Sequence, residues 1–289
     1  MSVLRTIRVY YRLAKPGIVY GNTLPTIAAF LFAAGWHGSL THLFATVVGI
    51  MGTIASAAVC NNYVDREMDA RMERTKHRPL VTGVVSPRGA LIYAGILGTI
   101  GIGTLALFVN ILSALLGFIG FCMYVFVYGY YKRNSEWGAV VGTIPGGIPA
   151  LVGYTAVTNS LDSSALLIFL TLVLWQLPHF YGIALFRMEE YVAAGVPILP
   201  AKRGVALAKQ HTLFFVIAYV LISPLLFFFS NAGYGYLIIV LGFGLAWLFI
   251  TLRGYRSPDY VSWARRVFFF SMVVMISFSV ALALAPVLP

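Results

Sequence analysis

Hydrophobic and polar positions alternate along the chain in long blocks. Glycine, proline or polar residues bound each apolar block, as in GWHGSLTH (35–42) and VSPRG (85–89). A membrane-crossing helix needs about 20 mostly apolar residues. Nine blocks meet this length, at approximately 17–35, 41–62, 89–109, 111–131, 137–157, 165–186, 211–230, 234–252 and 267–287. The pattern predicts an all-α integral membrane protein with nine transmembrane helices in one bundle around a central cavity.

Composition supports this class. Hydrophobic residues make up 60% of the 289 positions and charged residues only 10%, whereas a soluble domain is about 45–50% apolar and about 25% charged. A net charge of +11 on a soluble domain would indicate nucleic acid. Here the bases lie between apolar blocks, so we expect no nucleic-acid partner. The two cysteines lack the spacing of a metal or disulfide framework.

The bases also orient the chain. All 20 Lys and Arg fall in the N-terminal segment or in the connections after the second, fourth, sixth and eighth spans. An eight- or ten-helix chain would scatter them over both faces. The positive-inside rule therefore predicts nine helices with the N-terminus cytoplasmic and the C-terminus outside. Among the nine acidic residues, only Asp162 falls on the other face.

We expect residues 1–289 to form a single transmembrane domain. Residues 1–16 predict an amphipathic helix lying on the membrane surface, because Arg5, Arg8 and Arg12 share one helical face. The two long cytoplasmic connections, 63–88 and 187–210, are the expected active-site loops, since long loops carry function more often than short ones. The short N-terminal segment indicates a bacterial or archaeal plasma membrane, with the active site on its cytoplasmic side.

The rare charges crowd into NNYVDREMDARMERTKHRPL (61–80), at the end of the second span. On a continuous helix, Asn61, Asp65 and Asp69 follow each other at intervals of four and Asn62 joins the same stripe. Carboxylate and amide oxygens are ligands that suit Mg²⁺ bound together with a substrate phosphate. A solvated helix end with Asp–Arg pairs is the alternative, but it does not explain two asparagines inside the apolar run.

The bases after this stripe fit two interpretations. Lys76 and Arg78 are ordinary cytoplasmic charges under the positive-inside rule. They are also what a diphosphate requires, because cations beside a magnesium site bind it and stabilise the negative charge as it leaves. Both interpretations stay open on sequence alone.

A second group of polar residues follows the sixth span in WQLPHFYGIALFRMEEY (175–191). Pro178 is expected to interrupt the helix beside His179, and Arg187, Glu189 and Glu190 come next. The two glutamates either balance Arg187 or form a second metal or diphosphate half-site. In the fifth span, TIPGGIP (143–149) predicts a broken helix lining a cavity, with close helix packing at the glycines as the alternative.

The motif Asn-Asn-x-x-Asp-x-x-x-Asp at the end of the second span resembles the first aspartate-rich motif of the UbiA-type intramembrane prenyltransferases. Most of that superfamily has Asp where this chain has Asn62, and a DxxxD motif where it has the His179–Glu190 region. With these two departures, the sequence resembles the branch of the superfamily that farnesylates haem. The resemblance extends to KPGIVYGNTLP (15–25), GVPILP (195–200) and LRGY (252–255).

The resemblance implies transfer of the farnesyl group of farnesyl diphosphate to the 2-vinyl group of haem B, which is a substrate here and not a cofactor. The products are haem O, for maturation of haem-copper terminal oxidases, and diphosphate. It implies Mg²⁺ bound by Asn62, Asp65 and Asp69. The implied substrate-binding residues, beside Lys76 and Arg78, are Asn61, Arg133, His179, Arg187, Glu189, Glu190 and Lys202. His179 is the first candidate for contact with the haem iron or a propionate, followed by His211 and His77.

The implied partners are the lipid bilayer and a haem A synthase or terminal oxidase assembly proteins. A prenyltransferase acting on an aromatic quinone precursor is the nearest alternative, and the missing DxxxD motif counts against it. A transporter or cation channel is a different class. It would carry its carboxylates near mid-span, whereas these acids cluster at one face.

Overall fold

The structure, a computed structural model, describes residues 3–288. Within that range the chain is all-helical, and nine helical segments are long and apolar enough to cross a membrane. They are α2 (Pro16–Ala34), α3 (Leu40–Asp69), α4 (Pro87–Phe108), α5 (Ile111–Cys122) continued by the π-helix η1 (Met123–Tyr128) and α6 (Gly129–Asn134), α7 (Gly138–Thr158), α8 (Ser163–Phe186), α11 (Val205–Ile222) continued by α12 (Leu225–Phe229), α13 (Tyr234–Arg253) and α14 (Tyr260–Leu284). The predicted fold class is confirmed.

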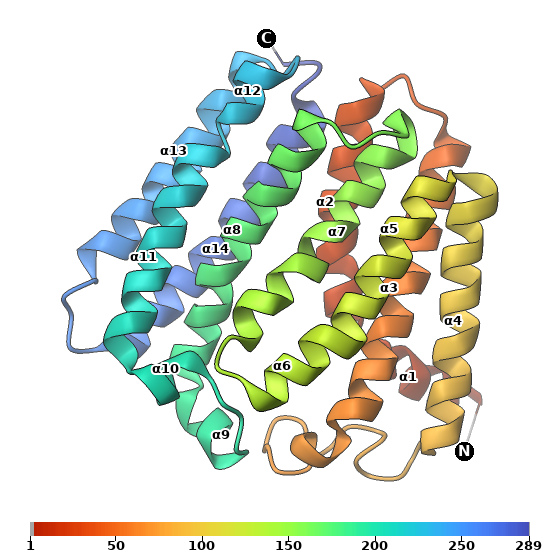
Figure 1. The fold of residues 1–289 in the computed structure, drawn as a ribbon, viewed down its shortest axis with the longest axis vertical. Helices are drawn as coiled ribbons and strands as arrows, with labels where there is room; N and C mark the ends of the chain where they lie inside the picture. The colour runs from red at the N-terminus through yellow and green to blue at the C-terminus, as the bar shows by residue number, and fades with distance from the viewer. Residues whose placement is uncertain (1–2, 289) are drawn as a thin grey trace.

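The spans run up and down in one bundle, so the two ends of the described chain lie at opposite ends of it (Figure 1). The end that carries α1 (Val3–Leu13), the connection from α3 to α4, α6, α9 (Met188–Ala193) and α10 (Leu199–Arg203) is called the loop end below. Helices α2, α7, α8 and α14 form the centre, where α7 packs against both α2 and α8, and α14 packs against the same two helices.

Two spans begin earlier than the hydrophobic pattern predicts. Helix α11 begins at Val205 instead of 211, and α14 begins at Tyr260 instead of 267. The added turns contain Lys209 and Arg265, which hydropathy excludes from a span. A helix is free to continue past the hydrocarbon region because its backbone hydrogen bonds are internal wherever it lies.

The proline-rich stretch of the fifth span is a continuous helix, so the predicted break in α7 is wrong. Helix α7 runs through Pro145 and Pro149. Neighbouring side chains bond to its backbone: Thr26 Oγ1 donates to Pro149 O at 2.9 Å, and Gln176 Nε2 donates to Thr143 O at 3.3 Å. The carbonyls that lose their N–H partner at the two prolines are those of Val141 and Pro145, four residues earlier. The two side-chain bonds therefore fasten α7 to its neighbours and do not replace the missing backbone bonds. The alternative of close packing at these glycines is confirmed at Gly147, where an added Cβ would lie 2.7 Å from Phe169 Cδ2.

Helix α8 likewise passes through Pro178 without ending, and it continues to Phe186. The predicted interruption beside His179 is therefore also wrong. The prolines of α7 and α8 still mark the centre of the molecule, because Pro145 and Pro149 line its central cavity and Pro178 is buried.

At the loop end, α1 packs back onto the bundle. Arg5, Arg8 and Arg12 are exposed, while Leu13 is fully buried against α3 and α4. Leu4 and Ile7 of this helix are exposed as well, and its position on the membrane surface stays a prediction. Its C-terminal end also contributes to the polar cluster, because Leu13 O accepts a hydrogen bond from Asn62 Nδ2 at 2.8 Å.

Candidate active site

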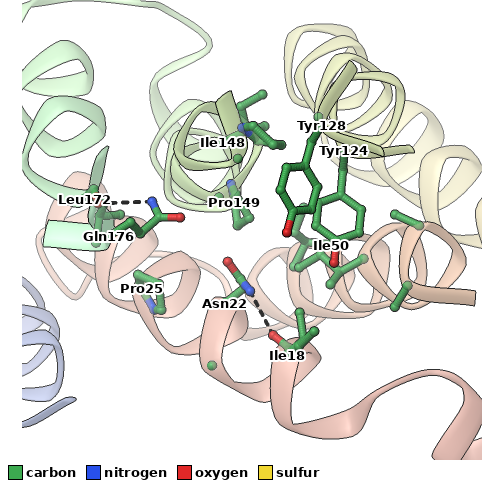
Figure 2. A pocket seen from close by; sticks show the side chains of 18 of the residues that line it. Ile18, Asn22, Pro25, Ile50, Tyr124, Tyr128, Ile148, Pro149, Leu172 and Gln176 are labelled. Atoms are coloured by element: carbon green, nitrogen blue, oxygen red, sulfur yellow. Dashed lines mark hydrogen bonds between the residues drawn. The ribbon is translucent and has the colours of Figure 1, made fainter. Parts of the chain in front are cut away.

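The predicted central cavity is present, with a volume of about 430 Å³, between α2, α3, α5 with η1, α7, α8 and α14. Its walls are formed mainly by apolar side chains and small residues. Figure 2 shows the polar side chains among them: Tyr124 and Tyr128 lie next to each other, and Asn22 and Gln176 point toward the same space from α2 and α8. The two tyrosine rings have centroids 5.3 Å apart. Such a cavity suits a hydrocarbon chain.

The four polar residues at the end of α3 are all buried, and they form the stripe that the sequence predicts. The helix continues without a break to Asp69, which turns Asn61, Asn62, Asp65 and Asp69 to one side. Buried carboxylates require cationic or hydrogen-bonding partners, since an isolated charge away from water is costly. The partners come from other elements.

Arg78 and Lys132 provide these partners. Arg78 Nη1 bonds to Asp69 Oδ2 and also donates to Asn62 Oδ1 at 3.2 Å. Lys132 Nζ pairs with Asp65 Oδ2 at 2.5 Å. The predicted candidate Arg78 is therefore in contact with the stripe. Lys132 is a cluster residue that the sequence did not identify.

Lys15 is a third cation in this cluster, and the sequence analysis missed it as a site residue. It precedes α2 in a left-handed backbone conformation, with φ of 52°, and its Nζ donates to Asn61 Oδ1 at 2.9 Å. The ammonium group is enclosed although the residue as a whole is only partly buried. This enclosure, with repulsion from Arg78 and Lys132, lowers the Lys15 pKa to about 7, against the opposing attraction of the two aspartates.

The cluster has unused binding capacity. Three cationic side chains face two carboxylates, which leaves an excess of positive charge when Lys15 is protonated. Two buried polar atoms, Asn61 Nδ2 and Asp65 Oδ1, have no hydrogen-bond partner among the described residues. Buried polar groups are usually satisfied, so these orphans indicate a place for a ligand.

The cluster and the cavity adjoin. Tyr128 lines the cavity one helical turn before Lys132, and Ala58 lines it three residues before Asn61. The arrangement can therefore hold an anionic head group and its metal at the cluster while an attached apolar tail extends into the cavity.

Several predicted residues lie outside the cluster. Arg133 is exposed and donates to two backbone carbonyls, Gly129 O at 3.0 Å and Val64 O at 3.4 Å. Lys76 pairs with the exposed Glu73 at 2.6 Å, and this contact lowers the Glu73 pKa. Lys202 is exposed on α10.

The residues of the second group form a separate contact between the two loops. Glu190 accepts from Arg187 at 3.1 Å and lies 3.7 Å from Arg74, which joins the 187–210 loop to the 63–88 loop. Glu189 is exposed, so the two glutamates face different surroundings. Within residues 3–288, no three His, Cys, Asp or Glu side chains are grouped as a metal site.

Among the three candidate histidines, only His179 lines the cavity. Its Nδ1 lies 2.8 Å from Ser271 Oγ, and its ring packs on Phe268 with centroids 4.6 Å apart. His211 instead contacts the Tyr181 hydroxyl at 3.2 Å, and His77 is exposed.

The bundle of membrane-spanning helices holds a positively charged cluster at one end of an apolar cavity. This arrangement suits an intramembrane prenyltransferase. The chain belongs to the UbiA prenyltransferase family, whose model matches residues 22–273. This confirms the resemblance seen in the sequence.

Curated relatives and solved structures agree with this assignment. The chain is 40% identical to "Protoheme IX farnesyltransferase 2" of Pseudomonas fluorescens (strain Pf0-1), over 96% of this chain and 95% of the relative. It is 41% identical to "Protoheme IX farnesyltransferase" of Sodalis glossinidius (strain morsitans), over 98% and 96%. A structure of digeranylgeranylglyceryl phosphate synthase superposes with a TM-score of 0.82 at 20% identity, covering 98% of this chain and 99% of that one.

A UbiA homologue from Archaeoglobus fulgidus, bound to GPP and Mg²⁺, superposes with a TM-score of 0.67 at 19% identity. The superposition covers 95% of this chain and 99% of the homologue. At this identity the likeness establishes the fold. The same homologue is also seen bound to DMAPP and Mg²⁺.

Proposed function

We propose that this protein transfers the farnesyl group of farnesyl diphosphate to the 2-vinyl group of haem B, producing haem O and diphosphate. The observation that carries the proposal is the buried cluster of two carboxylates and three cations at one end of an apolar cavity, in a chain about 40% identical to protoheme IX farnesyltransferases over nearly its whole length. The product would serve the maturation of haem-copper terminal oxidases.

The residues at the end of α3 suit Mg²⁺. Asn62, Asp65 and Asp69 offer hard oxygen ligands, and the Asp65 Oδ1 atom is buried without a hydrogen-bond partner. Bound there with a diphosphate, Mg²⁺ would neutralise part of its charge and make it a better leaving group. Asn61, which belongs to the same stripe, accepts a hydrogen bond from Lys15, the residue that precedes α2.

The cations hold the diphosphate head. Arg78, Lys132 and Lys15 enclose the stripe from three different elements and stabilise the negative charge that grows as the C–O bond breaks. The remaining predicted residues lie at the loop end outside this cluster, and we assign them to the rim of the site: Lys76, Arg133, Arg187, Glu189, Glu190 and Lys202.

The cavity receives the farnesyl chain. Its apolar walls exclude bulk water, which protects the allylic cation from early hydrolysis. The electron pair of the haem vinyl group then forms the new C–C bond, and the pair of the broken C–O bond leaves with the diphosphate. His179 faces this space from α8 and is assigned to the side of the acceptor.

The location of the reaction follows from the charge pattern. The bases gather at the loop end, so we place the N-terminus and the active site at the cytoplasmic face of a bacterial or archaeal plasma membrane, and the C-terminus outside. The chain acts as one domain, with the connections 70–86 and 187–204 over the site. The partners proposed beyond the substrates and lipid are a haem A synthase or oxidase assembly proteins.

A product assay tests the reaction. Membranes from a host that lacks haem O are supplied with haem B, farnesyl diphosphate and Mg²⁺, and the extracted haems are analysed by liquid chromatography and mass spectrometry. We expect a haem with the mass of the hydroxyethylfarnesyl derivative. Prenylation of 4-hydroxybenzoate in its place would keep the fold and overturn the acceptor, and prenylation of neither compound by folded protein would overturn the proposal.

A further inference from the structure

Gln176 presents an unpaired acceptor to the cavity at mid-span. Its Nε2 donates to Leu172 O at 3.0 Å and to Thr143 O at 3.3 Å. Both neighbours are carbonyls, which only accept, so the amide nitrogen must face them and the oxygen faces away. Figure 2 shows this oxygen on the side of Gln176 opposite Leu172, toward the other cavity residues. At Gly146, which also lines the cavity, an added Cβ would lie 1.8 Å from it.

His179 presents a second acceptor. The Ser271 hydroxyl donates its one proton to Phe268 O at 2.5 Å, so its oxygen is left to accept from His179 Nδ1 at 2.8 Å. The neutral imidazole thus carries its proton on Nδ1, and its Nε2 holds a free lone pair. No partner for Nε2 lies among the described residues.

The ring cannot easily turn away. Trp175 Nε1 donates to Ser271 O at 2.7 Å, which fixes the serine from a second side. Trp175 and Phe268 pack against the imidazole with centroids at 5.0 and 4.6 Å. Ser271 is fully buried. The contacts between α8 and α14 therefore set both the tautomer and the orientation of His179.

Gln176 and His179 lie three residues apart on α8, which places their side chains on one face of the helix. Both line the same cavity. A ligand that donates two hydrogen bonds can satisfy two acceptors on one face of a helix. A water molecule does so and keeps its oxygen lone pairs free to react.

We propose that Gln176 and His179 hold the water molecule that completes the transfer reaction, and that His179 Nε2 accepts its proton. The inference rests on the proposed function. Attack of the vinyl group leaves a cation on the carbon attached to the porphyrin. A lone pair of the water oxygen forms the C–O bond, one water proton moves to Nε2, and the product is the hydroxyethylfarnesyl haem. Ser271 is a positioning residue for this step.

The same lone pair could bind the haem iron instead, as the sequence analysis considered. One feature favours water: iron coordination gives no role to the free oxygen of Gln176. The water assignment uses both acceptors.

Product composition tests the proposal, because a purely structural role would lower the yield without changing the product. Without its base, the cation loses a proton to give an alkene, and the haem is lighter by one water. For His179→Gln we expect the ratio of hydrated to dehydrated product to fall by about 100-fold, the scale of general-base catalysis. For Gln176→Leu and Ser271→Ala we expect a fall of about tenfold, equivalent to the loss of one hydrogen bond.

His42→Gln is the matched control, since His42 is a partly buried histidine that bonds to Ala156 O at 2.8 Å and does not line the cavity. It should leave the ratio unchanged. An unchanged ratio in His179→Gln, or in Gln176→Leu and Ser271→Ala if the first variant does not fold, overturns the proposal. A shifted haem absorption band with an unchanged ratio would assign His179 to the iron. If the wild-type protein makes no farnesylated haem, the proposed function itself fails.

Discussion

Helices α3 and α8 both carry polar residues of the site, but they use them in opposite ways. The last turns of α3 carry buried carboxylates, each matched by a base from a distant segment. The middle of α8 carries neutral acceptors, Gln176 and His179, that line the cavity. One helix is built to hold charge, and the other to receive hydrogen bonds in an apolar space.

The second aspartate-rich motif that most of the superfamily carries is absent here. Beyond the end of α8, Arg187 pairs with Glu190 and Arg203 with Glu136, and no buried carboxylate pair lies there among the described residues. The charged chemistry is therefore concentrated on α3. The cavity wall beside α8, where haem B is proposed to bind, carries no charge of its own. A neutral wall suits a cationic intermediate that must not be captured by a nearby anion.

The largest effect is expected from removing charge on α3. Asp65→Asn takes away a ligand oxygen charge and the partner of Lys132, so we expect kcat/KM for farnesyl diphosphate to fall on the order of 10³-fold. Glu67→Gln removes a carboxylate from the exposed face of the same helix and should change kcat/KM less than twofold. Equal losses in the two variants, with both proteins folded, would show that the stripe has no special role.

A smaller effect separates two adjacent bases. Lys132→Met removes the cation that contacts Asp65, and we expect the KM for farnesyl diphosphate to rise about tenfold. Arg133→Met removes a guanidinium that bonds only to backbone carbonyls in the described contacts, and we expect less than a twofold change. The reverse ranking in steady-state assays would place the diphosphate on the other side of α6.

The smallest effect is a pH dependence from Lys15. Its pKa is lowered from 10.5 to about 7, so its positive charge is present below that pH and is lost above it. We expect the KM for farnesyl diphosphate to rise several-fold between about pH 6 and about pH 8 as this cation disappears. Lys15→Arg keeps the charge over the whole range and should flatten the profile. A profile identical to that of the wild type would assign the titration to another group.

The sequence predicts the spans and the α3 stripe well, because both depend on local periodicity. It does not identify Lys132, since the π-helical turn η1 just before α6 changes the helical phase, and a period of 3.6 residues cannot anticipate that change. It also misses Lys15, whose approach to Asn61 depends on a left-handed residue between α1 and α2.

The errors at the prolines have a similar cause. Pro145, Pro149 and Pro178 predict helix breaks by local rules, yet α7 and α8 run through them, because tertiary packing overrides local preference. Gln176 escaped notice because a single glutamine in an apolar run carries no motif. Its importance comes from its neighbours, which only the folded structure shows.

The length of α3 determines how the site exchanges its contents. Its 30 residues extend about 45 Å, well beyond the about 30 Å of a bilayer's hydrocarbon core. The aspartates stand on the final turns, so the cluster lies near the level of the lipid head groups while the cavity lies among the acyl chains. Released diphosphate and small ions can therefore exchange with the aqueous phase at the cluster, while the prenyl chain stays in the apolar cavity.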